Sequence, residues 1–266
     1  MSAPVAVLMP YYNYPTGLAR TLESFRGETE PFDLYIVDDG SVPSLALNTA
    51  EYPFPIYIVR LIKNVGIEGA LNAGLERILA SGYEFIARMD AGDLWIPGRL
   101  KAQRDFLAAH PDHVVVGSWA TAFNESGVDV FTSRYETDDA AIRNYIYLNS
   151  AFCHVATMFR ASAARQAGHY PTIYPAAEDY AFFWDMLNYG KGANLPAVWA
   201  KYEITSAVAS ISYHQRRKQL RSRRSVQMDR FNAREILSWW GILRTTMLLY
   251  FPYKLLLKIK SWLWRR

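Results

Sequence analysis

The chain has 266 residues, of which 51% are hydrophobic and 20% are charged, a size and composition that suit one α/β domain with an appendage and exclude a disordered chain. Its net charge of +4 conceals two parts of opposite sign, because residues 1–213 hold 15 lysines and arginines against 23 acids, whereas residues 214–266 hold 14 against 2. An acidic body joined to a strongly basic tail indicates that the tail meets an anionic partner.

Apolar runs alternate with helical patterns along the first half of the chain. Continuous apolar residues predict buried strands at 5–9, 34–37, 56–59, 85–89 and 114–116. Between them, helical spacing of apolar residues predicts helices beginning near residue 18, over 66–79 and over about 97–109. Strands that alternate with helices predict βαβ units and a mostly parallel sheet.

Two carboxylate-rich turns directly follow predicted strands. Asp38 and Asp39 come after the strand at 34–37, and Asp90 and Asp93 come after the strand at 85–89. Aspartate and glycine are also good turn formers, but two acidic strand ends on one sheet edge favour a binding site, because ligands bind beyond the carboxyl ends of parallel strands. No glycine-rich dinucleotide or P-loop motif is present, which disfavours a dehydrogenase or a P-loop nucleotidase. Acidic strand ends instead suit a divalent cation that neutralises a diphosphate.

Together with further motifs in the same order, these turns resemble the family 2 inverting glycosyltransferases, which have the GT-A fold. The resemblance covers about residues 4 to 212, and each motif is weak alone whereas the ordered set is specific. The matching segments are Pro10-Tyr11-Tyr12-Asn13, Val37-Asp38-Asp39-Gly40-Ser41, Asn64-Val65-Gly66, Ala70–Leu75, Arg88–Asp93, Pro97, Arg99-Leu100, His154–Phe159 with Arg160, and Glu178-Asp179-Tyr180.

The resemblance implies a nucleotide-sugar site and a cation. Tyr12 would pack on the base, and Asp38 or Asp39 would hydrogen-bond the base or the ribose. Asp90 and Asp93 would face the sugar diphosphate and its Mn²⁺ or Mg²⁺. Many family members carry an acid at the third position of this turn, where this chain has Gly92. The residues expected to bind the nucleotide sugar are Pro10, Tyr12, Asp38, Asp39, Asn64, Arg88 and Asp90.

The resemblance also implies that Asp179 is the general base, which removes the proton of the acceptor hydroxyl as that hydroxyl attacks the anomeric carbon. Carboxylates in a first helical turn are, alternatively, what helix electrostatics favours. Glu178, His154 and Trp95 are expected on the acceptor side. A buried, hydrogen-bonded His154 and a Trp95 packed under the following helix are the alternatives.

The basic tail carries six lysines and arginines within residues 213–224. An apolar helix over about 236–251 and an amphipathic helix after Pro252, with cations on one face, are predicted to follow. The apolar stretches are interrupted before they reach the roughly 18–20 residues of a membrane span. Interfacial membrane binding is therefore predicted, with a helical hairpin packed on the domain or on a partner subunit as the alternative. Nothing resembles a nucleic-acid reading module.

The sequence thus predicts a GT-A domain at 1–213 and a membrane-association tail at 214–266. The expected activity moves a hexose from a nucleotide-diphosphate sugar, expected to be a UDP-sugar, to a lipid-linked glycan in bacterial surface-polysaccharide synthesis. The expected place is the cytoplasmic face of the inner membrane, with a homo-oligomer possible. The lone Cys153 suits a reducing compartment, and the N-terminus does not resemble a signal peptide. A catalytically silent, membrane-tethered scaffold and a nucleotidyltransferase are the alternatives.

Overall fold

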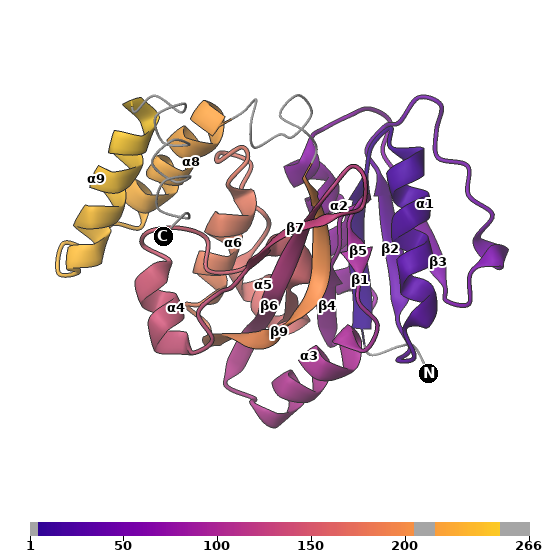
Figure 1. Cartoon of the computed structure of the whole chain (residues 1–266), viewed down its shortest axis with the longest axis horizontal. Helices are drawn as coiled ribbons and strands as arrows, with labels where there is room; N and C mark the ends of the chain where they lie inside the picture. The colour runs from indigo at the N-terminus through magenta and orange to yellow at the C-terminus, as the bar shows by residue number, and fades with distance from the viewer. Residues whose placement is uncertain (1–4, 205–215, 251–266) are drawn as a thin grey trace.

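The structure is a computed structural model, and it describes residues 5–204 and 216–250. A nine-stranded sheet runs through its centre with helices on both faces (Figure 1). The strands are β1 (Val5–Tyr11), β2 (Asp33–Asp38), β3 (Ile56–Arg60), β4 (Phe85–Arg88), β5 (Leu94–Trp95), β6 (His113–Asn124), β7 (Asp129–Ser133), β8 (Met158–Arg160) and β9 (Lys191–Ile204). The α-helices are α1 (Pro15–Ser24), α2 (Ile67–Ala80), α3 (Arg99–Ala109), α4 (Asp139–Tyr145), α5 (Ala161–Ala167), α6 (Glu178–Met186), α8 (Arg216–Asp229) and α9 (Ile236–Tyr250). Short 3₁₀ turns are η1 (Phe25–Gly27), η2 (Thr49–Glu51) and η3 (His154–Ala156).

The strand order is β3-β2-β1-β4-β8-β6-β9-β5, with β7 paired to β6. Strands β3, β2, β1 and β4 run parallel to one another, so the first half of the sheet is the predicted βαβ arrangement. β8 runs antiparallel to both β4 and β6. β5 pairs antiparallel with β9, and β7 pairs antiparallel with β6. The α/β fold is thus confirmed, and the antiparallel pairs are confined to the second half.

Alternate residues of the central strands feed two separate cores, one on each face of the sheet. In β1, Val5, Val7 and Met9 belong to a core shared with α1 and α3, whereas Ala6 and Leu8 belong to a core shared with α2, α5 and α6. Because both faces of these strands are covered, each strand is a continuous apolar run, which is why the sequence predicted them well.

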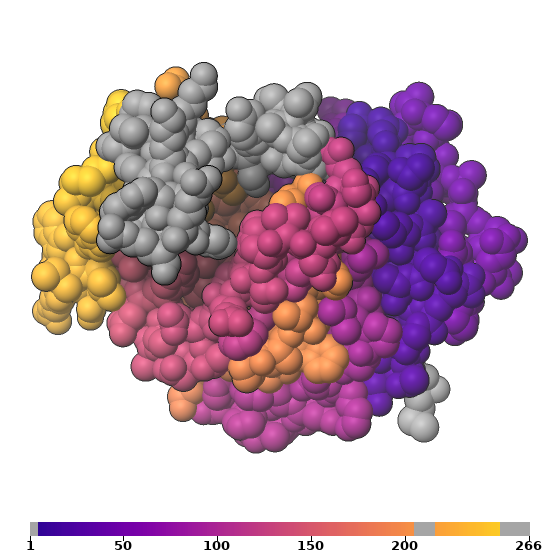
Figure 2. All heavy atoms as spheres, in the orientation of Figure 1, coloured from indigo at the N-terminus to yellow at the C-terminus, as the bar shows by residue number. Residues whose placement is uncertain are grey.

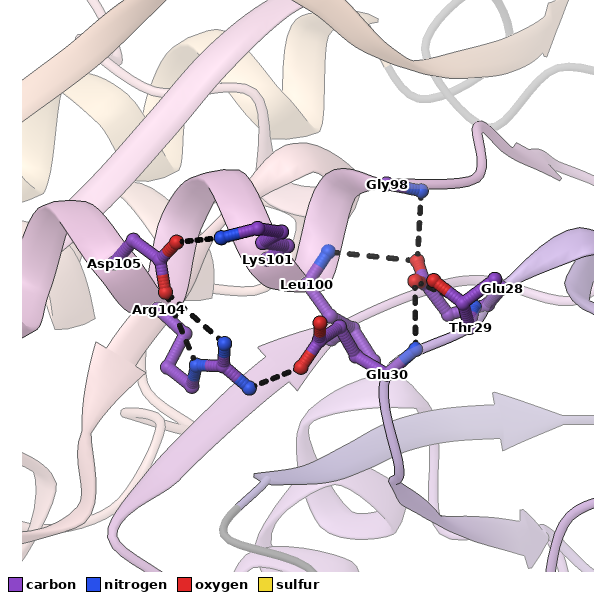
Figure 3. A network of polar contacts seen from close by, with 8 residues as sticks. All are labelled: Glu28, Thr29, Glu30, Gly98, Leu100, Lys101, Arg104 and Asp105. Atoms are coloured by element: carbon purple, nitrogen blue, oxygen red, sulfur yellow. Dashed lines mark hydrogen bonds and ion pairs between the residues drawn. The ribbon is translucent and has the colours of Figure 1, made fainter.

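Glu28, just after η1, fixes the start of α3. Its carboxylate accepts hydrogen bonds from the backbone N–H of Gly98, at 3.1 Å, and from the indole Nε1 of Trp95, at 2.9 Å. Figure 3 shows this carboxylate facing the first turn of α3, and beside it the ion pair between Arg104 and Glu30. These contacts hold α3 against the segment that leads into β2, and they anchor the chain immediately after the acidic turn at 90–93.

Helices α8 and α9 form a hairpin that packs on the remainder of the described chain. Arg230 of the loop after α8 pairs with Asp185 of α6 through two contacts of 2.8 and 2.5 Å. Gln227 Nε2 donates to the carbonyl oxygen of Tyr147 at 2.8 Å, and Arg244 Nη1 donates to that of Leu148 at 3.0 Å. Residues 216–250 therefore dock on the part of the chain described by residues 5–204, and the amphipathic helix predicted after Pro252 lies outside the described residues.

Within residues 5–204 and 216–250, no helix combines the length and the apolar character that crossing a bilayer requires.

Candidate active site

A cavity of about 710 Å³ opens where the carboxyl ends of β1, β2 and β4 meet the first turn of α6. Both acidic turns contribute to it, as their place on one sheet edge predicted. Eight of the residues expected from the sequence line it: Pro10, Tyr12, Asp39, Asn64, Asp90, His154, Glu178 and Asp179. Four others, Asp38, Arg88, Asp93 and Trp95, do not line it.

The neighbouring carboxylates Asp38 and Asp39 have different tasks. Asp38 is buried and does not line the cavity, and its two oxygens accept from the backbone N–H groups of Ser41, at 3.0 Å, and Leu45, at 2.9 Å, so it holds its own loop. Asp39 accepts from the backbone N–H groups of Val65, at 2.8 Å, and Gly66, at 3.1 Å. It thereby joins the first acidic turn to the start of α2, and burial raises its pKa.

Arg88 at the end of β4 is fully buried and acts on its neighbours. Its guanidinium donates to Asp90 Oδ1 at 2.5 Å, to the carbonyl oxygen of Met89 at 2.9 Å, and to His154 Nε2 at 2.8 Å. Burial and the charge of Arg88 lower the pKa of His154 well below its usual value, so this histidine is neutral. Arg88 therefore orients Asp90 and His154 from behind and does not reach the cavity, which corrects the expectation that it contacts the nucleotide sugar.

Gly92 is required by the packing of the second acidic turn. Its φ is +110°, and a Cβ there would lie 2.8 Å from Tyr14 Cε1. The hydroxyl of Tyr14 donates to Glu203 Oε2 at 2.7 Å, and the same carboxylate oxygen pairs with Arg20 at 2.7 Å. Tyr14 is thus held over Gly92, and an acidic side chain at this position would be both strained and blocked.

Asp93 is turned away from the cavity. It is buried and accepts from the backbone N–H of Glu203 at 2.8 Å, and burial together with the nearby Asp90 raises its pKa well above the usual value. Among the described residues, no three histidine, cysteine or acidic side chains group closely enough to hold a metal ion by themselves. Asp90 is therefore the carboxylate of this turn that could bind a cation, an arrangement that suits Mg²⁺ or Mn²⁺ sharing its coordination with phosphate oxygens and water.

Glu178 and Asp179 begin α6 as predicted, and both face the cavity. Burial raises the pKa of Asp179, while the backbone N–H of Tyr180 and the charge of Arg223 on α8 oppose that rise. Burial and the adjacent Asp179 raise the pKa of Glu178 to about 8. Glu178 Oε2 is buried without a hydrogen-bond partner in the described structure, which together with the raised pKa favours the neutral form of Glu178.

Trp95 lies in the core instead of the cavity. It is 2% exposed, its ring packs 4.8 Å from that of Phe25, and the guanidinium of Arg99 lies 4.1 Å from its ring centroid. The expected place of Trp95 on the acceptor side is corrected to the alternative, a side chain packed under α3.

Sequence reasoning missed several lining residues. Tyr14 and Glu68 line the cavity beside the predicted motifs, and Lys218 and Gln219 reach it from α8. Glu68 had a signal, since it follows Asn64-Val65-Gly66 in the first turn of a predicted helix. No sequence signal placed Lys218 at the site, because the basic segment around it was predicted to be a membrane-association tail. Only the docking of α8 brings Lys218 to the cavity.

A family model described as glycosyl transferase family 2 matches residues 6–168. Among curated proteins, the amylovoran biosynthesis glycosyltransferase AmsE of Erwinia amylovora is 32% identical over 210 residues, which are 76% of each chain. WfgD of Escherichia coli, a UDP-Glc:α-D-GlcNAc-diphosphoundecaprenol β-1,3-glucosyltransferase, is 25% identical over 130 residues, or 48% of this chain and 51% of WfgD.

Solved structures share the fold at low sequence identity. The 1–349 fragment of S. aureus TarS in complex with UDP-GlcNAc has a TM-score of 0.65 at 19% identity, covering 94% of this chain and 70% of that one. This chain spans 44% of the longer TarS structure. The mannosyltransferase PcManGT from Pyrobaculum calidifontis, in complex with GDP-Man and Mn²⁺, has a TM-score of 0.60 at 17% identity, with coverages of 94% and 70%.

Proposed function

This chain belongs to glycosyl transferase family 2 and is a glycosyltransferase, and we propose that it moves a hexose from a nucleotide-diphosphate sugar to a hydroxyl of a lipid-linked glycan with inversion. A UDP-sugar is the proposed donor. One observation carries the proposal: Tyr12 and Asp39 follow β1 and β2, Asp90 follows the next strand of the sheet, β4, and Asp179 begins α6, and all four line a single cavity. A nucleotide, a diphosphate and an acceptor hydroxyl can then meet in that order.

The chemistry follows from these positions. Tyr12 is half exposed and can stack on the base, while Asp39 can accept from a ribose or base donor. Asp179 accepts the proton of the acceptor hydroxyl as its oxygen attacks the anomeric carbon, and the bond to the nucleoside diphosphate breaks on the opposite face. His154, neutral and held by Arg88, shapes the wall between donor and acceptor.

A divalent cation, Mn²⁺ or Mg²⁺, is proposed at Asp90. The donor set supports it, because one carboxylate plus diphosphate oxygens and water is a common magnesium environment. Mn²⁺ in the PcManGT complex also supports it. When bound, the cation stabilises negative charge on the departing diphosphate, and Arg88 keeps Asp90 oriented for it.

The names of two relatives support the acceptor and the pathway. AmsE is named for amylovoran biosynthesis, and the acceptor in the name of WfgD is a diphosphoundecaprenol-linked sugar. We therefore propose a lipid-linked acceptor, used in the synthesis of lipopolysaccharide, O-antigen, capsule or exopolysaccharide.

The outer face of α9 supports peripheral attachment to the cytoplasmic face of the inner membrane. α9 lies at the end of the molecule opposite β3 (Figure 1) and forms the margin of the face drawn in Figure 2. Exposed apolar side chains share one side of this helix at spacings of three and four: Ile236, Trp239, Trp240, Leu243, Met247 and Tyr250. Beside them, Arg217, Arg221 and Arg224 of α8 line a cleft of about 450 Å³ with Leu249 and Tyr250. Apolar and cationic side chains on adjoining surfaces are what an anionic bilayer surface binds.

The activity is tested by nucleoside diphosphate release. Wild-type protein is incubated with UDP-glucose, UDP-galactose, UDP-GlcNAc and GDP-mannose, with bacterial lipid extract as the acceptor source, and with or without Mn²⁺ or Mg²⁺. Release from one UDP-sugar that depends on the cation is expected. Absence of release from every donor would refute the proposed transfer.

The attachment is tested by flotation with vesicles of 30% phosphatidylglycerol in phosphatidylcholine. Wild-type protein is expected to float, and the double variant Trp239→Ala/Trp240→Ala is expected to remain largely at the bottom. Tyr189→Ala, which removes an equally exposed aromatic ring from the loop before β9, is the matched control and is expected to float. Flotation of the double variant at the wild-type level would remove the α9 face from this role.

A further inference from the structure

The side chains that line the cavity are mostly acidic, and α8 contributes a lysine to them. Apart from the neutral His154, five of its lining residues are acids and one is a cation: Asp39, Glu68, Asp90, Glu178, Asp179 and Lys218. Even with Glu178 protonated, such a cavity repels diphosphates, because like charges at close range raise each other's energy. Of the described residues that line it, Lys218 is the one with a positive charge.

Packing, and not its own contacts, places Lys218 at the cavity. Leu220 and Val226 on the inner side of α8 are buried, and Gln227 and Arg230 tie the end of the helix to Tyr147 and to Asp185 of α6. The ammonium group of Lys218 has no hydrogen-bond or ion-pair partner within 5–204 and 216–250. A lysine that lines a cavity and has no partner among these residues can bind a ligand anion.

Lys218 lies on the acceptor side of the cavity. α8 packs against α6, which carries Glu178 and Asp179, and Figure 1 shows both helices on the side of the molecule away from β2 and β3. Tyr12 and Asp39, the residues suited to the nucleotide, follow β1 and β2. The donor diphosphate can be neutralised at Asp90 by a cation, whereas Lys218 lines the cavity from the helix that packs on α6, which carries the proposed base.

We propose that Lys218 binds the diphosphate group of a lipid-linked acceptor at the α6 end of the cavity. This inference rests on the proposed function, because it names the part of the acceptor that the same site recognises. Lysine binds phosphate as a compact point charge with three donors, which suits a diphosphate that enters and leaves. Arg217, Arg221 and Arg224 of α8 line the cleft beside the apolar face of α9, so one helix would contact headgroups through these arginines and the acceptor diphosphate through Lys218.

The test uses binding, so it does not depend on knowing the sugar. Farnesyl diphosphate, farnesol and UDP are titrated calorimetrically into wild-type full-length protein and into Lys218→Met, Lys218→Arg and Lys101→Met, in buffer without divalent metal. Lys101 is a matched control, since it is an exposed helical lysine on α3 paired with Asp105. Loss of one charge-assisted hydrogen bond predicts an affinity for farnesyl diphosphate about 10-fold or more lower in Lys218→Met. Lys218→Arg should keep most of the affinity, and Lys101→Met should match wild type.

Farnesol and UDP separate the possible sources of a phosphate effect. Farnesol should bind all four proteins equally, and UDP should bind Lys218→Met within about two-fold of wild type. A parallel loss of UDP affinity would assign Lys218 to the donor and overturn the inference. Failure of wild type to prefer farnesyl diphosphate over farnesol, or an unchanged Lys218→Met, would overturn it as well. Nucleoside diphosphate release is measured separately, so failure of the transfer activity is distinguishable from failure of this site.

Discussion

Replacing Gly241 with alanine should decide whether α9 is docked on the body or is a detachable tail. A Cβ at residue 241 would lie 2.0 Å from the carbonyl oxygen of Tyr147, in a contact with backbone that cannot rotate away. Either α9 or the turn at 147 must therefore move by more than an ångström, since non-bonded atoms rest at about 3.5 Å. That movement strains the hydrogen bond from Arg244 to Leu148 or the one from Gln227 to Tyr147.

The change in the free energy of unfolding has opposite signs for a docked and an undocked α9. Overpacking of this kind costs about 1–3 kcal/mol, and one lost hydrogen bond costs about 1 kcal/mol more. A glycine-to-alanine change in an undocked helix instead stabilises it by about 1 kcal/mol. We expect a net loss of about 2 kcal/mol in the free energy of unfolding, seen as a fall of about 4–8 °C in Tm.

Thermal unfolding followed by circular dichroism measures this change. Leu243→Ala, two residues along and on the exposed side of α9, is the control and should shift Tm little. An unchanged or raised Tm in Gly241→Ala would refute the docking, and residues 214–266 would then be the separate tail that the sequence predicted.

Asp179→Asn should lower kcat by about 10²-fold or more, because an amide cannot accept the proton of the acceptor hydroxyl. The dissociation constant for the donor, measured by calorimetry, should stay near wild type. Near-normal turnover would contradict the role of Asp179 as base. Asp90→Asn should weaken donor binding in the presence of Mn²⁺ and abolish the difference that Mn²⁺ makes; a titration of wild type that shows no effect of metal would contradict the cation site. Glu178→Gln should raise Tm at pH 8 but little at pH 5. The pKa of Glu178 is raised to about 8 by burial and Asp179, so its ionisation destabilises the folded state increasingly as pH rises from about 4.5 towards 8, and glutamine removes that dependence. Equal shifts of Tm at both pH values would show that Glu178 is not protonated in the folded protein.

Much of the nucleotide half of the fold was predictable because its signals are local. β1 and β2 are buried on both faces, so each must be a continuous apolar run, and the turn residues that follow them must carry any polar function of that sheet edge. The helix at 67–80 and the start of α6 at Glu178 likewise follow from spacing and first-turn carboxylates.

Other features depend on partners distant in the sequence. β6 and β9 pair in parallel along most of their length, although about 70 residues separate them, and neither the extent of β6 nor the existence of β9 was predicted. No local pattern reveals such a pairing, because periodicity reports which face of a segment is buried and not what buries it.

The same limit applies within the site. The sequence by itself determined that acidic side chains gather at the ends of β2 and β4 and that Glu178 and Asp179 begin a helix. Only the tertiary structure decided that Asp39 lines the cavity while Asp38 lies outside it and holds its own loop. It also decided that Lys218 of the basic tail is part of the site. The physical reason is that a side chain's role is set by the groups packed around it, and those groups come from segments whose approach no run of neighbouring residues encodes.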